Sequence, residues 1–257
     1  MLLQACINGA RDAAEHPLLS SDAALMAEAA ARAVAAGAHE VHVHPKDAAG
    51  RDSLEADDMA RWVRAFREAC PGVPIGVTTG AWAEPDAERR RAAVSAWTQL
   101  PDFASVNWHE AGADEVAALL RSRDIGVEAG IWDGVGLDAW RRSPVRSDCL
   151  RVLIELPDED AAIVRDHAEG MIAHVAREEP ELPILLHGEE RSAWTAFDLA
   201  VERGLDARIG LEDVLTLPDG LPAPDNAALV RAAVLRIPPP ESRAPTPGEE
   251  RRSALDR

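Results

Sequence analysis

Two histidines occupy alternate positions in the segment "HEVHVHPKD" (39–47), which otherwise predicts a buried strand. Side chains alternate between the two faces of a strand, so His42 and His44 share the face opposite Val43. Imidazole nitrogen is a common ligand of zinc and related divalent ions. The spacing therefore favours two ligands of one metal ion. The alternative is a pair of strand histidines that only satisfy hydrogen bonds.

A carboxylate far along the chain can complete a metal site. Glu212 lies in the segment "GLED" (210–213), at the end of another predicted strand. Two histidines and one carboxylate, with a position left open for water or substrate, are a common catalytic zinc set. The same mixed nitrogen and oxygen ligands can hold iron(II), manganese or cobalt, which we expect less than zinc. A helix cap or a loop carboxylate is the alternative role of Glu212.

These residues belong to a repeated alternation of strand and helix. Eight β-rich runs recur at intervals of roughly 22 to 35 residues, each followed by a helical stretch. The runs are 2–8, 39–44, 74–79, 103–109, 125–132, 149–156, 183–188 and 207–213. Eight such units in one chain predict an α/β fold, a closed (β/α)8 TIM barrel. The alternative, an open doubly wound sheet, normally carries a glycine-rich fingerprint after its first strand, and the sequence has none there.

The barrel is expected to form a single domain over residues 1–236. From residue 237 the sequence becomes "IPPPESRAPTPGEERRSALDR", which is rich in proline and charge. Such a composition lacks the apolar residues of a core. We therefore expect residues 237–257 to form an extended or disordered tail.

Most of the predicted strands carry polar residues on the face that turns toward the barrel interior. Unpaired polar groups buried there would cost about 1–3 kcal/mol each, so a function or a partner should account for them. Active sites of these barrels lie at the carboxyl ends of the strands. His109 and His187 are interpreted as neutral, hydrogen-bonded residues near the mouth of such a site. The polar residues near strand ends are His42, His44, Thr78, Thr79, Asn107, His109, Glu128, Glu212 and Asp213.

Composition excludes several classes of partner. The formal net charge of −18 argues against nucleic-acid binding, which needs a basic surface, and against an anionic membrane. No apolar stretch reaches the roughly 18 residues of a membrane helix. The cysteines, three in number and widely scattered, favour a reducing cytoplasm over a disulfide framework.

Three segments together resemble the β-keto acid cleavage enzymes, a family that includes 3-keto-5-aminohexanoate cleavage enzyme. They are "AAGAHEVHVHPKDAAGR", "VTTG" (77–80) and "RIGLED" (208–213), in the order of the family pattern, and the resemblance runs over most of residues 1–235. It implies a zinc-dependent (β/α)8 barrel that condenses a β-keto acid with acetyl-CoA. The products would be acetoacetate and an acyl-CoA. Relatives are typically tetramers, so a homo-oligomer is expected.

The resemblance also implies residue roles. His42, His44 and Glu212 would bind zinc, and Asp213 would be the general base, oriented by Arg208. Glu128 would join the catalytic residues near the substrate. The expected substrate-binding residues are Thr78, Thr79, Asn107, His109 and Lys46.

Some positions depart from the family pattern and leave the substrate open. Lys46 stands where the family has arginine, which replaces a planar fork of donors by a point charge. Gly130 stands where a second glutamate is common, and "NWHEAG" (107–112) replaces a smaller loop. Two other functions compete with the cleavage enzyme. One is a metal-dependent hydrolase of the amidohydrolase type, whose further histidines on the fifth and sixth strands are missing here, and the other is a non-catalytic barrel that keeps the metal.

Overall fold

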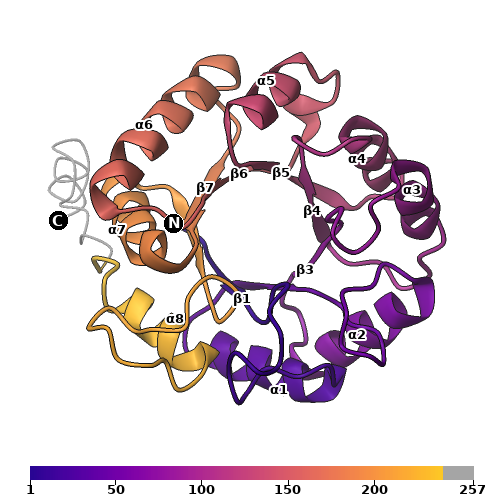
Figure 1. Ribbon diagram of the computed structural model, residues 1–257, viewed down its shortest axis with the longest axis horizontal. Helices are drawn as coiled ribbons and strands as arrows, with labels where there is room; N and C mark the ends of the chain where they lie inside the picture. The colour runs from indigo at the N-terminus through magenta and orange to yellow at the C-terminus, as the bar shows by residue number, and fades with distance from the viewer. Residues whose placement is uncertain (240–257) are drawn as a thin grey trace, which may run out of the picture.

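The computed structural model describes residues 1–239 and confirms the predicted (β/α)8 barrel (Figure 1). Its parallel strands close in sequence order, from β1 next to β2 round to β8 next to β1. The strands are β1 Leu3–Cys6, β2 Glu40–Val43, β3 Ile75–Thr78, β4 Phe103–Asn107, β5 Gly126–Ile131, β6 Arg151–Leu156, β7 Ile184–Gly188 and β8 Asp206–Ile209.

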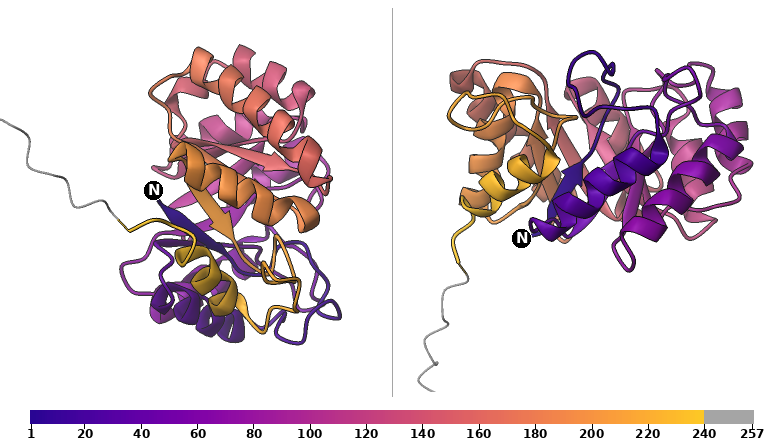
Figure 2. Two further views of the ribbon diagram at one scale, coloured as in Figure 1. Left: turned by 90° about the vertical axis from the view of Figure 1, so that its left-hand side faces the viewer. Right: turned by 90° about the horizontal axis from the view of Figure 1, so that it is seen from below.

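Helices surround the barrel on the outside (Figure 1). They are α1 Ala23–Ala35, α2 Ala56–Ala69, α3 Ala87–Ser95, α4 Ala113–Arg121, α5 Gly134–Arg142, α6 Ala161–Glu178, α7 Ala193–Arg203 and α8 Asn226–Val234. Two short 3-10 turns, Arg146–Asp148 and Glu190–Ser192, precede β6 and α7. Figure 2 shows that the first residues and the chain after α8 lie at the same end of the barrel. Of the expected tail, residues 240–257 lie outside the described residues.

The main core lies between the strands and the helices. In α2, Met59, Trp62, Val63 and Phe66 recur at helical spacing and are all buried. Trp62 Nε1 also donates to the backbone carbonyl of Lys46 at 3.0 Å, which fixes the loop after β2 against the helix. Cys6, Cys70 and Cys149 are free and buried. Within residues 1–239, no helix combines the length and apolarity needed to cross a bilayer.

A buried polar cluster fills the barrel interior at the amino-terminal half of the strands. Arg151 Nε donates to Glu128 Oε1 at 2.8 Å, and the same guanidinium binds Glu40. Gln4 Nε2 donates to Glu40 and Glu128, at 2.8 and 2.9 Å. The cluster therefore pairs the inward polar side chains of this half with one another, and it fills the interior below the strand ends.

The junction of β1 and β8 needs one glycine and one asparagine. A Cβ at Gly210 would lie 1.8 Å from the carbonyl oxygen of Cys6, so only glycine permits this approach. Asn226, at the start of α8, accepts from the Leu211 amide at 2.8 Å and donates to the Ile7 carbonyl at 2.9 Å. These contacts hold the end of β1 beside the segment that carries Glu212.

We expect Asn226→Leu to lower the free energy of unfolding by about 2–4 kcal/mol, because two buried backbone groups lose their partners. Chemical denaturation measures the change. Arg231→Ala is the control, since Arg231 is an exposed residue of the same helix and surface changes usually stay within about 0.5 kcal/mol. Equal stabilities of the Asn226→Leu variant and the wild type would show that the two hydrogen bonds contribute nothing.

Candidate metal centre

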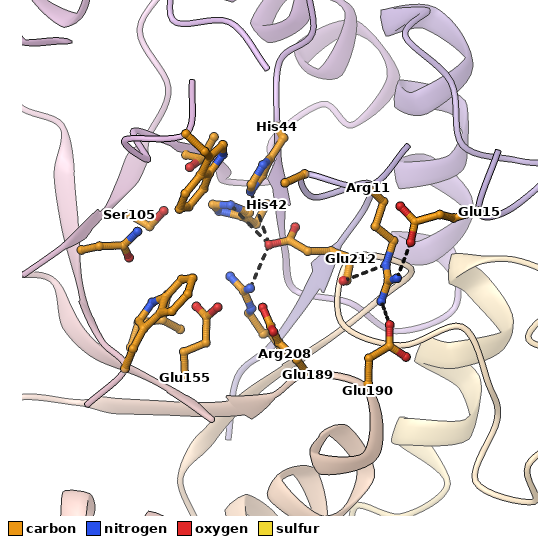
Figure 3. A pocket seen from close by; sticks show the side chains of 16 residues that line it. Arg11, Glu15, His42, His44, Ser105, Glu155, Glu189, Glu190, Arg208 and Glu212 are labelled. Atoms are coloured by element: carbon orange, nitrogen blue, oxygen red, sulfur yellow. Dashed lines mark hydrogen bonds and ion pairs between the residues drawn. The ribbon is translucent and has the colours of Figure 1, made fainter. Parts of the chain in front are cut away.

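A cavity of about 310 Å³ opens at the carboxyl ends of the strands (Figure 3). It contains the two predicted histidine ligands and the predicted glutamate, and it is mainly polar on the side of β2 and β8. Its lining residues are Ala10, Arg11, Glu15, His42, His44, Thr78, Trp82, Ser105, Asn107, Trp132, Leu153, Glu155, Glu189, Glu190, Arg208 and Glu212.

The structure brings His42, His44 and Glu212 together. One ligand atom from each lies within 4.8 Å of the other two. His44 Nε2 is 3.4 Å and His42 Nε2 is 4.0 Å from Glu212 Oε1. Ligand atoms at about 2.0–2.2 Å from a tetrahedral zinc ion are roughly 3.4 Å apart, so these separations suit a shared ion.

Unpaired polar atoms at this site also fit a metal. Glu212 Oε2 and His42 Nδ1 are buried and lack a hydrogen-bond partner among the described residues. Burial lowers the pKa of His42 to about 4, so its ring is neutral and has a free electron pair to offer. Burial alone would raise the pKa of Glu212, but Arg208 and the two histidines hold it well below its usual value. The group is therefore an ionised ligand.

His44 is oriented by a carboxylate that the sequence reasoning missed. Its Nδ1 lies 2.9 Å from Asp52 Oδ2, which leaves Nε2 facing Glu212. Trp82 stacks on the His44 ring at 5.8 Å and donates to Asp52 at 2.7 Å. Burial opposes protonation of His44, but Glu212 and Asp52 raise its pKa to about 9. Glu212 and Asp52 thus favour a positive charge on His44. A metal cation at His44 Nε2 would supply that charge in place of a proton.

We expect Asp52→Asn to weaken zinc binding by about 10- to 100-fold, because it removes the carboxylate that orients His44. Competition with a chromophoric chelator gives the affinity. Asp47→Asn is a matched control in the same loop, where Asp47 binds the exposed Arg51 and does not touch a ligand. Identical zinc affinities of the two variants would contradict a role for Asp52.

Arg208 and Asp213 adjoin the glutamate ligand, as predicted. Arg208 Nη2 donates to Glu212 Oε1 at 2.8 Å and lies 3.3 Å from Asp213 Oδ1. Arg208 faces the cavity, whereas the carboxylate of Asp213 lies behind it and is 1% exposed. The guanidinium therefore joins the metal ligand to the predicted base.

Only part of the predicted substrate-binding set lines the cavity. Thr78 and Asn107 do so. Thr79 donates to the carbonyl of Ser105 at 2.7 Å, and His109 packs on Trp132 at the exposed rim. Lys46 is buried beside the site and occupied by Asp52 and, at 2.7 Å, by the Gly9 carbonyl.

Glu128 lies deeper than the cavity. It is fully buried and belongs to the interior cluster with Arg151. Its second oxygen, Oε2, has no hydrogen-bond partner and lies 3.9 Å from His42 Nδ1. The structure thus places this predicted catalytic carboxylate beneath a metal ligand, outside the lining of the cavity.

Comparison with known proteins identifies the family to which the chain belongs. The family model of the beta-keto acid cleavage enzymes matches residues 1–134 and 158–255. The chain belongs to this family. Among curated proteins, none matches the chain.

Solved structures with the same fold include two of ObcA. "Apo structure of ObcA" and "Ternary complex of ObcA with C4-CoA adduct and oxalate" are each 17% identical to this chain, with a TM-score of 0.65. They cover 86% of this chain, which spans 61% and 63% of theirs. The tryptophan synthase alpha chain of Legionella pneumophila is similar at 11% identity and a TM-score of 0.59, over 94% of this chain and 93% of that one. These likenesses support the barrel fold.

In this member of the beta-keto acid cleavage enzyme family, the structure places two further residues at the site, Glu155 and His187. Neither was among the catalytic, substrate-binding or metal-binding residues predicted from the sequence. Glu155 of β6 lines the cavity, and its Oε2 lies 3.1 Å from His187 Nε2 on β7. The interpretation of His187 as a neutral residue near the mouth is wrong. Burial and Arg208 oppose its charge, but Glu155 and Asp213 on either side raise its pKa to about 9. Alternation along "RVLIEL" (151–156) was the available signal, because it directs Arg151, Leu153 and Glu155 inward.

The cavity mouth contains further residues that come from loops. Arg11 Nε donates to the backbone carbonyl of Glu212 at 3.0 Å, and its guanidinium also binds Glu15 and Glu190 (Figure 3). Burial and the neighbouring Glu155 raise the pKa of Glu189 to about 7. Loop residues have no strand periodicity, so sequence pattern alone could not direct them to the site.

Proposed function

We propose that this chain is a zinc-dependent β-keto acid cleavage enzyme, which condenses a β-keto acid with acetyl-CoA to give acetoacetate and an acyl-CoA. The observation that carries the proposal is the cluster of His42, His44 and Glu212 beside the Arg208–Asp213 pair. The family match supports the reaction class. ObcA, whose solved complex contains a C4-CoA adduct, supports coenzyme A as the carrier of the second substrate.

The residues present fit a divalent cation. His42, His44 and Glu212 would hold it, and when bound it would polarise the carbonyl and carboxylate oxygens of a β-keto acid. Hydroxyl and amide groups of Thr78, Ser105 and Asn107 line the same cavity and can donate to those oxygens. Together they would fix one orientation of the substrate.

Asp213 is proposed to take the proton from the carbon between the two carbonyl groups of the substrate. A proton in this position is acidic enough for a carboxylate base. The resulting carbanion attacks the thioester carbonyl of acetyl-CoA, and the thiolate of coenzyme A leaves. The thiolate then attacks the original keto carbon, and the carbon–carbon bond breaks to give the new acyl-CoA and the carbanion of acetoacetate. This carbanion takes the proton back from Asp213, which restores the carboxylate. Arg208 balances the negative charge of Asp213 and of the developing oxyanions.

A panel of β-keto acids with acetyl-CoA tests the function. We expect acetoacetate to form together with a new acyl-CoA, in equal amounts, and to require both substrates. Consumption of a substrate without acetyl-CoA would favour the hydrolase. The strands β5 and β6, where such hydrolases place further histidines, have none. Absence of turnover with every keto acid, in protein that contains zinc, would favour the non-catalytic barrel.

Elemental analysis and light scattering test the remaining expectations. We propose about one zinc per chain and a homotetramer in solution. Iron, manganese or cobalt in the purified protein would replace zinc in the proposal without changing the ligands. A monomer in solution would contradict the proposed assembly.

A further inference from the structure

A buried run of alternating charges leads from Glu212, which follows β8, past His187 on β7 to Glu155 on β6. Glu212, Arg208, Asp213, His187 and Glu155 follow one another, with each neighbouring pair within 3.3 Å. Figure 3 shows its two ends, Glu212 and Glu155, with Arg208 between them. The proposed function uses the first three residues and leaves His187 and Glu155 without a role.

The contacts of His187 place one carboxylate beside each ring nitrogen. Nδ1 lies 3.2 Å from Asp213 Oδ1 and Nε2 lies 3.1 Å from Glu155 Oε2. An ionised carboxylate only accepts hydrogen bonds, so an imidazole with a single proton could serve one partner but not both. The ring is 1% exposed, and water cannot replace either contact. A doubly protonated His187 would therefore face a carboxylate on each side.

These contacts leave the two oxygens of Asp213 unequal. Oδ1 faces two cations, His187 at 3.2 Å and Arg208 at 3.3 Å. Both oxygens are buried and neither makes a hydrogen bond among the described residues, but cationic groups lie within 3.3 Å of Oδ1 alone. Two cations on one oxygen set the direction in which the other oxygen points, as expected for a carboxylate that accepts a proton through Oδ2.

We propose that His187 is a positioning residue, which holds Asp213 Oδ1 and thereby presents Oδ2 as the base, and that Glu155 secures the imidazole from the other side. The inference rests on the proposed function. Glu155 and the whole of β6 lie outside the segments that the family model matches.

Two amide substitutions distinguish positioning from simple filling of space. In His187→Asn the amide nitrogen can replace Nδ1 and donate to Asp213, whereas in His187→Gln it takes the place of Nε2 and donates to Glu155. We expect kcat for acetoacetate formation to fall about 100-fold in His187→Gln and in His187→Leu, since a misplaced base costs about that much. His187→Asn should keep most of kcat. KM for the keto acid and the zinc content should stay near the wild-type values in all three.

Matched controls and a second readout keep the test decisive. His167 makes a similar contact, 3.2 Å to Glu159, at the surface of α6, and His167→Asn and His167→Gln should both leave kcat unchanged. Nitrogen NMR of histidine-labelled protein should show both His187 nitrogens protonated at neutral pH. The signal, assigned by its loss in His187→Asn, should shift in Asp213→Asn and in Glu155→Gln.

The outcomes separate this inference from the proposed function. Equal kcat values for His187→Asn and His187→Gln would overturn the positioning role, whether both are active or both inactive. If the wild type cleaves no keto acid, the function fails, and the NMR signal alone then decides whether His187 holds Asp213. A singly protonated His187 would overturn the inference even in an active enzyme.

Discussion

Replacing Asp213 by asparagine lowers kcat for acetoacetate formation by about 1,000-fold, within the usual range for loss of a general base. Asparagine has nearly the same shape and can still accept from Arg208 and His187 through its carbonyl oxygen, so the site should keep its structure. It cannot take a proton from carbon. Zinc should remain bound, because Asp213 is not among the three clustered ligands.

Steady-state kinetics and elemental analysis of the same preparation check this expectation. Asp206→Asn is the control, since Asp206 starts the same strand and binds the Leu2 amide at the opposite end of the barrel. Loss of zinc from Asp213→Asn would show that the roles of Glu212 and Asp213 are exchanged. Unchanged kcat would place the base elsewhere, and Glu155 and Glu189 are carboxylates that line the cavity.

We expect removal of the proposed zinc to abolish turnover and to lower the stability of the chain. A ligand that binds only the folded state adds about 4 kcal/mol when its free concentration is about 1,000 times its Kd. For a chain of this size we expect a fall in Tm of roughly 10 °C after chelation. The metal-free barrel should stay folded at room temperature, because Arg208 still binds Glu212 and the interior cluster around Arg151 is unaffected.

Thermal unfolding with and without added zinc measures the effect. Glu212→Gln should lose both the activity and the zinc-dependent rise in Tm, since a neutral amide is a poor ligand for the ion. Asp213→Asn should keep the rise in Tm, which makes the two variants a matched pair at neighbouring positions. A chelated protein with undiminished turnover would refute both the cleavage enzyme and the hydrolase.

Sequence predicted the fold and the cluster of His42, His44 and Glu212 because both depend on short periodic segments. Alternation gave the faces of β2, and the eightfold repeat of strand and helix gave the barrel, which together place His42 and His44 inside. The alternation of side chains shows which face a residue occupies, but it does not show how far along the barrel axis the residue lies. Glu128 and Thr78 both face inward, yet only Thr78 reaches the cavity.

The site residues that the sequence did not predict are placed by strand register or lie in loops. Glu155 meets His187 because β6 and β7 pair in a register that sets these residues side by side. A buried pair of this kind is recognised only when both strands are placed together. Asp52 and Trp82 come from loops after β2 and β3, where no period indicates direction. Lys46 was expected to bind substrate from its place in the motif, but Asp52 and Gly9 already occupy its ammonium group.

The buried polar cluster of the barrel interior has a kinetic consequence. It is formed by Gln4, Glu40, Glu128 and Arg151. The cavity that contains His42, His44 and Glu212 opens at the carboxyl ends of the strands, so we expect both proposed substrates to enter from the loop side. The smaller keto acid would then have to bind at the inner end of the cavity before acetyl-CoA binds. The acyl-CoA product would be released before acetoacetate. Dead-end inhibition patterns would reveal such an ordered mechanism of substrate binding and product release.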